Sequence, residues 1–129
     1  MRRPNYEDVR WDHGAADAAM GACERCAAEL DRTLGDTGHA AAQARAQWQG
    51  NHQDRFAQER QALNGHGRAL VIACRAAARA IATASQQAYE EQARRLRERA
   101  AYEQWQREER EREAREEEER RERARQQRV

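Results

Sequence analysis

The chain has 129 residues, of which 36% are charged and 39% hydrophobic, and its formal net charge is +1. A chain of this length forms at most one domain, and its near-neutral charge gives no overall field to recruit nucleic acid or an acidic membrane. No apolar run approaches the roughly 18 residues needed to cross a bilayer, so we expect no membrane span.

Residues 1–14 precede the first helical pattern and form a lead-in. Met1-Arg2-Arg3-Pro4 gives the chain the basic start of a signal peptide, but no apolar stretch follows it. We therefore expect synthesis and folding in the cytoplasm. If the protein is secreted, it must leave the cell folded and by a route that uses no signal peptide.

Small and apolar residues then recur in alternating steps of four and three along two segments that meet near residues 48–51. This heptad spacing places them on one face of each helix. Because the link is short, the helices must fold back antiparallel to bury both faces. The sequence thus predicts an all-α fold, an antiparallel helix-turn-helix hairpin over residues 15–93. The larger residues expected to pack in its seam or in a dimer are Met20, Cys23, Leu30, Leu34, Leu63, Leu70, Cys74 and Ile81.

Trp48-Gln49-Gly50 lies at the predicted bend. Gly50 can adopt the left-handed conformation that ends a helix, and Asn51 is a good N-cap for the next one. Trp48 has two compatible roles, because it can pack against Phe56 at the bend and also present part of its ring to a partner. We treat Trp48, Gly50 and Phe56 as a bend and recognition motif.

Matching Trp48 with Phe56 across the bend sets the register of the two arms. The numbers of facing residues then sum to about 104. Large residues mostly face small ones in this register, as packed helical seams prefer. The resulting pairs are Leu30 with Cys74, Leu34 with Leu70, Cys23 with Ile81 and Ala41 with Leu63.

The same register brings four glycines to one level: Gly35, Gly38, Gly65 and Gly67. Each glycine inside a helix costs about 1 kcal/mol relative to alanine, so this level is a weak point of the hairpin. One interpretation is a kink or a frayed turn in each arm. The other is the close approach of a partner's backbone.

Beyond Ala88 the heptad pattern fails, and from Gln106 onward the chain is almost entirely glutamate and arginine. Pairs such as Glu108–Arg112 and Glu117–Arg121 have the i,i+4 spacing that stabilises an exposed helix. Residues 94–129 are therefore predicted to be a long charged helical extension or a partly disordered tail. The alternative interpretation is a docking rod for secretion machinery or for a neighbouring protein.

The cysteines and histidines show no pattern typical of a catalytic or metal site. Cys23 and Cys26 form a C-x-x-C inside a helical pattern, without a second such motif or a histidine pair to complete a zinc site. We assign the thiols a packing role. Two alternatives are a Cys26–Cys74 bridge, which the register sets about one turn apart and near the limit for a disulfide, and a disulfide between chains in an oxidising space. We expect no enzyme, no metal, no cofactor and no nucleic-acid partner.

A hairpin rich in alanine has one thin seam in place of a sizeable core. At about 25 cal/mol per Å² of apolar area, alanine contacts contribute little against the entropy of ordering two long helices. We therefore expect a partner to complete the core.

Residues 9–92 resemble the WXG family, the small helical-hairpin substrates of type VII secretion systems that include the early secreted antigens. The resemblance rests on Trp48-X-Gly50 at the bend, on Phe56 eight residues after the tryptophan, on the arm lengths, and on Trp11 near the start of the first arm. It implies pairing with a homologous hairpin, as a homodimer or heterodimer, into a four-helix bundle. It also implies recognition by type VII secretion machinery.

The family's export signal, Tyr-x-x-x-Asp/Glu after the second helix, is absent. Tyr89 is followed at the fourth place by Ala93, and the nearest imitation is Trp105-x-x-x-Glu109. We therefore expect the partner to supply the signal. Two other functions fit the same residues: a cytoplasmic adaptor or scaffold that works through the charged tail, and a carrier for a toxin encoded nearby.

Overall fold

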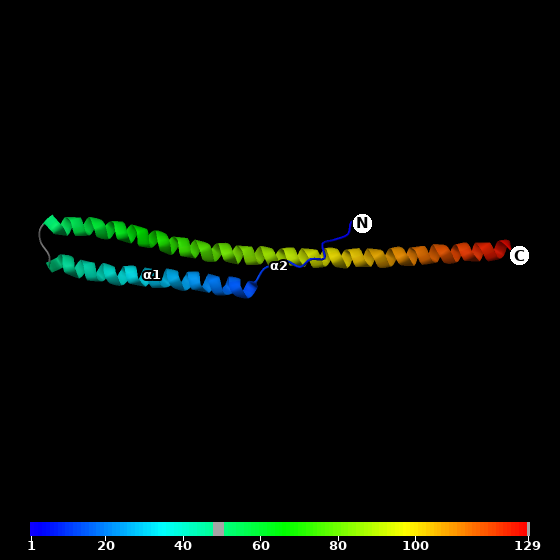
Figure 1. The fold of residues 1–129 in the computed structure, drawn as a ribbon, viewed down its shortest axis with the longest axis horizontal. Helices are drawn as coiled ribbons and strands as arrows, with labels where there is room; N and C mark the ends of the chain where they lie inside the picture. Colours follow the sequence, from blue (N-terminus) through cyan, green and yellow to red (C-terminus); the bar gives the residue numbers. More distant parts are fainter. Residues whose placement is uncertain (48–50, 129) are drawn as a thin grey trace. The chain divides into compact units, whose positions relative to one another are not determined.

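The computed structural model describes residues 1–47 and 51–128, with no side chain described for Asn51. Two helices are present, α1 over His13–Gln47 and α2 over Asn51–Gln127 (Figure 1). No strand occurs in the described ranges, so the predicted all-α fold is confirmed. Trp48 and Gly50 of the predicted bend motif lie outside the described residues.

The start of α1 is fixed by a cap that the sequence analysis missed. Asp12 Oδ1 accepts a hydrogen bond of 2.9 Å from the backbone N–H of Ala15. This is the geometry of an N-cap, in which a short polar side chain satisfies an amide of the first turn that has no partner within the helix. The helix consequently begins at His13, two residues before the predicted boundary.

The chain divides into two units, which are described separately. The hairpin unit comprises Trp11–Gln86 and contains α1 and the first part of α2. The tail unit comprises Met1–Arg10 with Gln87–Val129 and contains the rest of α2.

In the hairpin unit, α1 and α2 run antiparallel and meet along a seam of small side chains. Ala27 is 1% exposed, and Ala16, Val71 and Ala78 are also buried. The predicted seam residues that are half-buried are Met20, Cys23, Leu30, Leu34, Cys74 and Ile81. The heptad reading of α1 therefore describes its buried face well.

Leu63 and Leu70 do not pack in this seam, so of their two predicted roles the packing within a dimer stays a prediction. They are 62% and 55% exposed, whereas their neighbours Asn64 and Val71 are half-buried and buried. The inward face of α2 thus keeps Cys74 and Ile81 but includes Asn64 and Val71 in place of Leu63 and Leu70. Two apolar stripes lie side by side on α2, and the one with smaller residues lets α1 approach more closely.

The register also differs from the predicted one. Leu34 lies against Gly67 rather than Leu70. The contact is so close that a Cβ added at Gly67 would stand only 2.6 Å from Leu34 Cδ2. Asp31 and Arg75 form an ion pair across the helices at 3.8 Å. The shift from Leu70 to Gly67 is about 4.5 Å along the axis at 1.5 Å per residue. Its physical cause is the gap at Gly67, which accepts the Leu34 side chain.

The four glycines do not interrupt the helices. Both α1 and α2 remain helical through Gly35, Gly38, Gly65 and Gly67, so no turn is frayed there. A Cβ at Gly35, Gly38 or Gly65 would meet nothing within 4 Å. At Gly67 the close approach is made by Leu34 of the same chain.

In the tail unit the lead-in is held against α2 by hydrogen bonds, and we call residues 5–9 the strap. Val9 N donates to Gln92 Oε1 at 2.8 Å, and Arg95 Nη1 donates to the Glu7 carbonyl at 2.8 Å. Arg99 makes the largest set of contacts, through the Asn5 and Glu7 carbonyls and an ion pair of 2.9 Å with Asp8. Beyond the last apolar residues of the heptad face of α2, polar residues therefore occupy that face and bind the strap.

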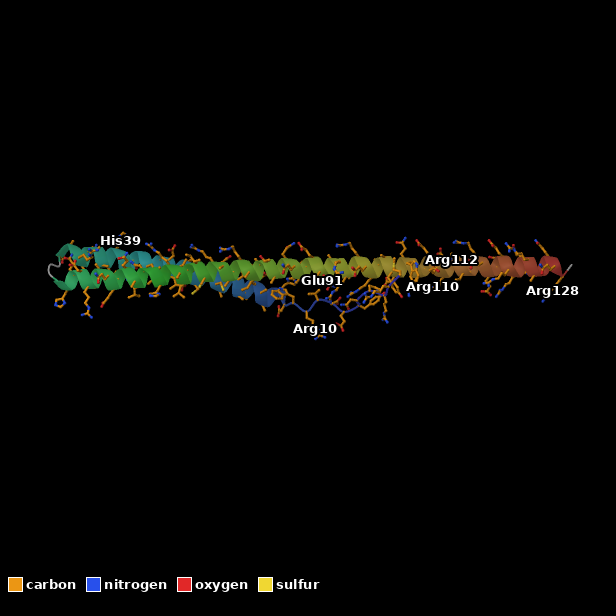
Figure 2. All side chains as sticks on the ribbon, turned by 90° about the horizontal axis from the view of Figure 1, so that it is seen from above. Arg10, His39, Glu91, Arg110, Arg112 and Arg128 are labelled. Atoms are coloured by element: carbon orange, nitrogen blue, oxygen red, sulfur yellow. The ribbon has the colours of Figure 1, made fainter. Side chains whose placement is uncertain are left out.

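The end of α2 is a solvated helix. Every described residue from Arg110 to Arg128 is exposed, and Figure 2 shows Arg110, Arg112 and Arg128 projecting from it. The expected pair Glu117–Arg121 forms at 2.6 Å, whereas Arg112 pairs with Glu109 rather than with Glu108. The structure thus favours a helical extension over a partly disordered tail.

The contact at Gly67 predicts opposite consequences for two glycines of α2. Gly65→Ala should raise the free energy of unfolding by about 1 kcal/mol, because alanine favours the helix and the added methyl meets open space. Gly67→Ala should raise the free energy of unfolding by less than this or should lower it, since the added methyl displaces Leu34. Urea unfolding of the two variants measures the difference. An equal gain in both would contradict the register.

The ion pairs around Glu91 predict an acid titration. Hydrogen bonds from Arg94 and then Arg95 lower the pKa of Glu91 from its ordinary value of 4.5 to about 2. Because the folded pKa is depressed, the stabilisation is fully present above pH 4.5 and is lost as the pH falls through about 2. Side-chain carboxyl NMR should give that midpoint. Arg94→Gln should raise the midpoint of Glu91. Arg97→Gln removes the same charge at an exposed position and should leave the midpoint unchanged.

Candidate pairing surface

An apolar stripe, with exposed leucines at its centre, runs along α2 in the hairpin unit beside the seam. Phe56, Leu63 and Leu70 are spaced by seven residues, which keeps them on one face of the helix. Ala77 and Ala84 continue the same spacing toward the end of the unit. The two leucines are the predicted seam residues that the structure leaves exposed, so they now form a surface feature.

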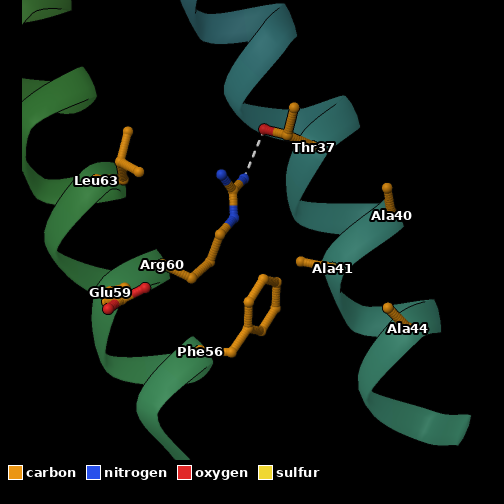
Figure 3. Close-up of a pocket in the computed structure, with 8 residues that line it drawn as sticks. All are labelled: Thr37, Ala40, Ala41, Ala44, Phe56, Glu59, Arg60 and Leu63. Carbon is orange, nitrogen blue, oxygen red and sulfur yellow. Dashed lines mark hydrogen bonds between the residues drawn. The ribbon is translucent and has the colours of Figure 1, made fainter. Parts of the chain in front are cut away.

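The stripe borders a groove between α1 and α2 (Figure 3). Alanines from α1 form one wall, and Phe56 and Leu63 from α2 form the other. The groove has a volume of about 400 Å³. We call it the pairing groove, and it is lined by Thr37, Ala40, Ala41, Ala44, Phe56, Glu59, Arg60 and Leu63.

Small residues on α1 opposite a large ring on α2 explain why a hollow forms there. Alanine side chains end at Cβ, so Ala40 and Ala44 leave space beside the half-buried ring of Phe56. The void is open to the surface rather than enclosed in the seam. An apolar side chain from another helix could fill it and bury the ring.

One polar contact crosses the groove. Arg60 Nη2 donates to Thr37 Oγ1 at 2.5 Å (Figure 3). The Thr37 hydroxyl in turn donates to the Thr33 carbonyl at 2.7 Å. Arg60 Nε and Asn64 Oδ1 are buried without a hydrogen-bond partner among the described residues. Burying polar atoms in this way costs stability, so the seam is weaker beside the groove than at Ala27.

The remaining predicted motif residues fall in different places. Phe56 lies in the groove, whereas the roles of Trp48 and Gly50 stay predictions. Tyr89 is 58% exposed on α2 in the tail unit. Trp105 packs against Tyr102, with ring centroids 5.7 Å apart, and Glu109 is held by Arg112. The Glu109 carboxylate of the imitation export signal is therefore engaged by its own helix.

The sequence analysis missed the pairing groove and the strap. The signal for the groove was present: α2 has two adjacent apolar stripes, and a single hairpin can bury only one of them. The strap has a weaker signal, since Gln92, Arg95 and Arg99 keep the heptad spacing with polar residues. Long polar side chains at seam positions indicate an ordered polar ligand, here the lead-in.

The lining of the pairing groove suits contact with an apolar surface. The pairing groove gathers mainly apolar groups, with Glu59, Arg60 and Thr37 at its polar positions. Within the described ranges, no group of three or more histidine, cysteine, aspartate or glutamate side chains could hold a metal ion. No helix in the described part of the chain is long and apolar enough to cross a membrane.

The inward face of α2 predicts a contrast between adjacent residues. Val71→Ala should lower the free energy of unfolding by about 2 kcal/mol, since it removes buried methyl groups from the seam. Leu70→Ala should change it by less than about 0.5 kcal/mol, because the leucine is exposed. Denaturant unfolding of the isolated chain at low concentration tests both. The reverse order of effects would restore the predicted seam.

No protein-family model, curated protein or solved structure matches this chain. The resemblance to the WXG family therefore rests on the residues quoted for it, and the pairing surface rests on the geometry of the hairpin unit.

Proposed function

We propose that this protein is a non-enzymatic helical hairpin that works by pairing with a homologous hairpin, as a substrate or targeting partner of a type VII secretion system. The observation that carries the pairing is the apolar stripe Phe56–Leu63–Leu70 beside an open groove. A second helix pair laid along this face completes a four-helix bundle.

The energetics of the isolated chain favour a partner. The chain exposes 10678 Å² at a mass of 14.9 kDa, whereas a compact monomer of that mass exposes roughly 7000 Å². Covering a leucine side chain contributes about 1.5–3 kcal/mol, so Leu63 and Leu70 together offer more than the alanines of the seam supply at the same level. Pairing would therefore add a large share of the core.

The secretion role is supported by the sequence resemblance. Trp48-X-Gly50, Phe56 and the arm lengths are those of the WXG family, and the pairing groove contains Phe56 itself. The Tyr-x-x-x-Asp/Glu signal is absent, and Glu109 of the nearest imitation is bound to Arg112. In the proposed complex the partner carries the signal, and this chain contributes the complementary half of the bundle.

A second candidate function is favoured by the tail. The described residues 110–128 form an exposed charged helix with no apolar face to pack. Such a helix suits a cytoplasmic adaptor or scaffold that presents a charged rod to other proteins, or a carrier that escorts a neighbouring toxin. In that function the hairpin would anchor the rod.

Purification of the tagged chain from its native host tests the proposal. Light scattering and peptide identification should show a stoichiometric second hairpin protein that carries its own Tyr-x-x-x-Asp/Glu. Leu63→Glu with Leu70→Glu should lose that partner while keeping the helical circular dichroism, because both positions are exposed.

Ile72→Glu is the matched control. Ile72 is 65% exposed and flanks Val71 on the side opposite Leu70, so its charge should leave the partner bound. A homodimer found only in the cell fraction would favour the adaptor. Loss of the partner in Ile72→Glu but not in the double variant would overturn the proposed surface.

A further inference from the structure

Three cysteine thiols meet at one level of the hairpin unit. Cys23 and Cys26 lie one turn apart on α1, and Cys74 lies on α2; all three are free thiols. The contact of Leu34 with Gly67 sets the level: one heptad further along each helix, Ala27 lies level with Cys74, which places Cys26, the neighbour of Ala27, beside Cys74. The Cys26 side chain is accordingly among the groups that raise the pKa of Cys74. The cluster therefore brings together side chains that are 48 residues apart in the sequence.

Contacts on both sides hold the helices close at this level. Ala27, beside Cys26, is 1% exposed, and Ala78, one turn from Cys74, is 4% exposed. Alanines at a seam allow the helix axes to approach at the short end of the usual range, about 8 Å. Asp31 and Arg75 form an exposed ion pair of 3.8 Å beyond Cys26 along α1, and nearer the start of α1 Trp11 Nε1 donates to Ser85 Oγ at 3.0 Å.

We infer that Cys26 and Cys74 are a disulfide-forming modification site that locks α1 to α2 within one chain, with Cys23 as a third thiol able to exchange into the bond. This inference goes beyond the proposed pairing function and concerns the isolated chain. It also revises the sequence-based register, which set Cys26 a full turn from Cys74. Disulfide formation requires the thiols to be level and the backbones near, and the described contacts supply both conditions.

The reactant is a small-molecule disulfide, such as oxidised glutathione, or an exposed disulfide of another protein. The Cys26 thiolate attacks one sulfur, forms a mixed disulfide and releases one thiolate. The Cys74 thiolate then attacks Cys26 Sγ and releases the second. The two protons of Cys26 and Cys74 end on the two released thiols, so the hairpin is oxidised by two electrons and the external disulfide is reduced.

Exposure sets the order of these steps. Cys26 is exposed, whereas Cys74 is half-buried. Burial, followed by the neighbouring Cys26 side chain, raises the pKa of Cys74, which lowers its thiolate fraction. External disulfides therefore meet Cys26 first. Cys74 acts second, when Cys26 Sγ is already beside it as the electrophile.

The test uses the full chain, incubated with and without oxidised glutathione and then alkylated. Intact mass should show a monomer that has lost two hydrogen atoms, and non-reducing peptide mapping should identify a Cys26–Cys74 link. The folding equilibrium constant should rise by roughly two to three orders of magnitude, because the link closes a long loop. Addition of a reductant should reverse the change.

Three variants separate the outcomes. Cys23→Ala should keep both the link and the stabilisation, whereas Cys26→Ala and Cys74→Ala should lose the Cys26–Cys74 link while remaining helical by circular dichroism. A Cys23–Cys26 link, disulfide-linked dimers only, or a mixed disulfide that stays on Cys26 without closing would each overturn the inference. None of these readouts requires a partner, so they stand apart from the test of pairing.

Discussion

Close packing of the two helices through small side chains is the constraint on which the hairpin depends. Small side chains such as Ala27 and Ala78 let the two helices approach closely, and this proximity aligns the thiols and the Asp31–Arg75 pair. The same small side chains bury little apolar area. The seam therefore sets the register of the helices but contributes little to the free energy of folding. The larger leucines of α2 are left outside and define the face available to a partner.

Hydrophobic periodicity was sufficient to predict two helices, their antiparallel arrangement and the buried face of α1. On α2 it placed Cys74 and Ile81 in the seam correctly but not Leu70, because Leu70 and Val71 belong to adjacent stripes that both have heptad spacing. Side-chain size alone predicts that the leucine stripe packs against α1. The stripe that does pack is the one that lets the two backbones approach closely, and this closeness depends on both helices, so the pattern of one helix does not reveal it.

The register error has a related cause. A register anchored on Trp48 and Phe56 assumes that two large aromatic residues face each other, but Leu34 finds its place against the missing side chain of Gly67. A glycine in a helical pattern can mark either a break or a gap that receives a neighbour, and the sequence does not distinguish them. The Asp12 cap and the strap were missed because each depends on a single residue or on polar contacts between distant segments.

The seam changes in character along the hairpin, with buried alanines at one level and unsatisfied Arg60 and Asn64 near the groove. The free energy of local opening should therefore be lower at the groove end, and amide hydrogens there should exchange with solvent sooner than those around Ala27. A ligand that fills the groove would suppress these openings, so the entropy lost in ordering the hairpin would offset part of its binding free energy. The affinity of the groove would then depend on how firmly the helices pack around Ala27.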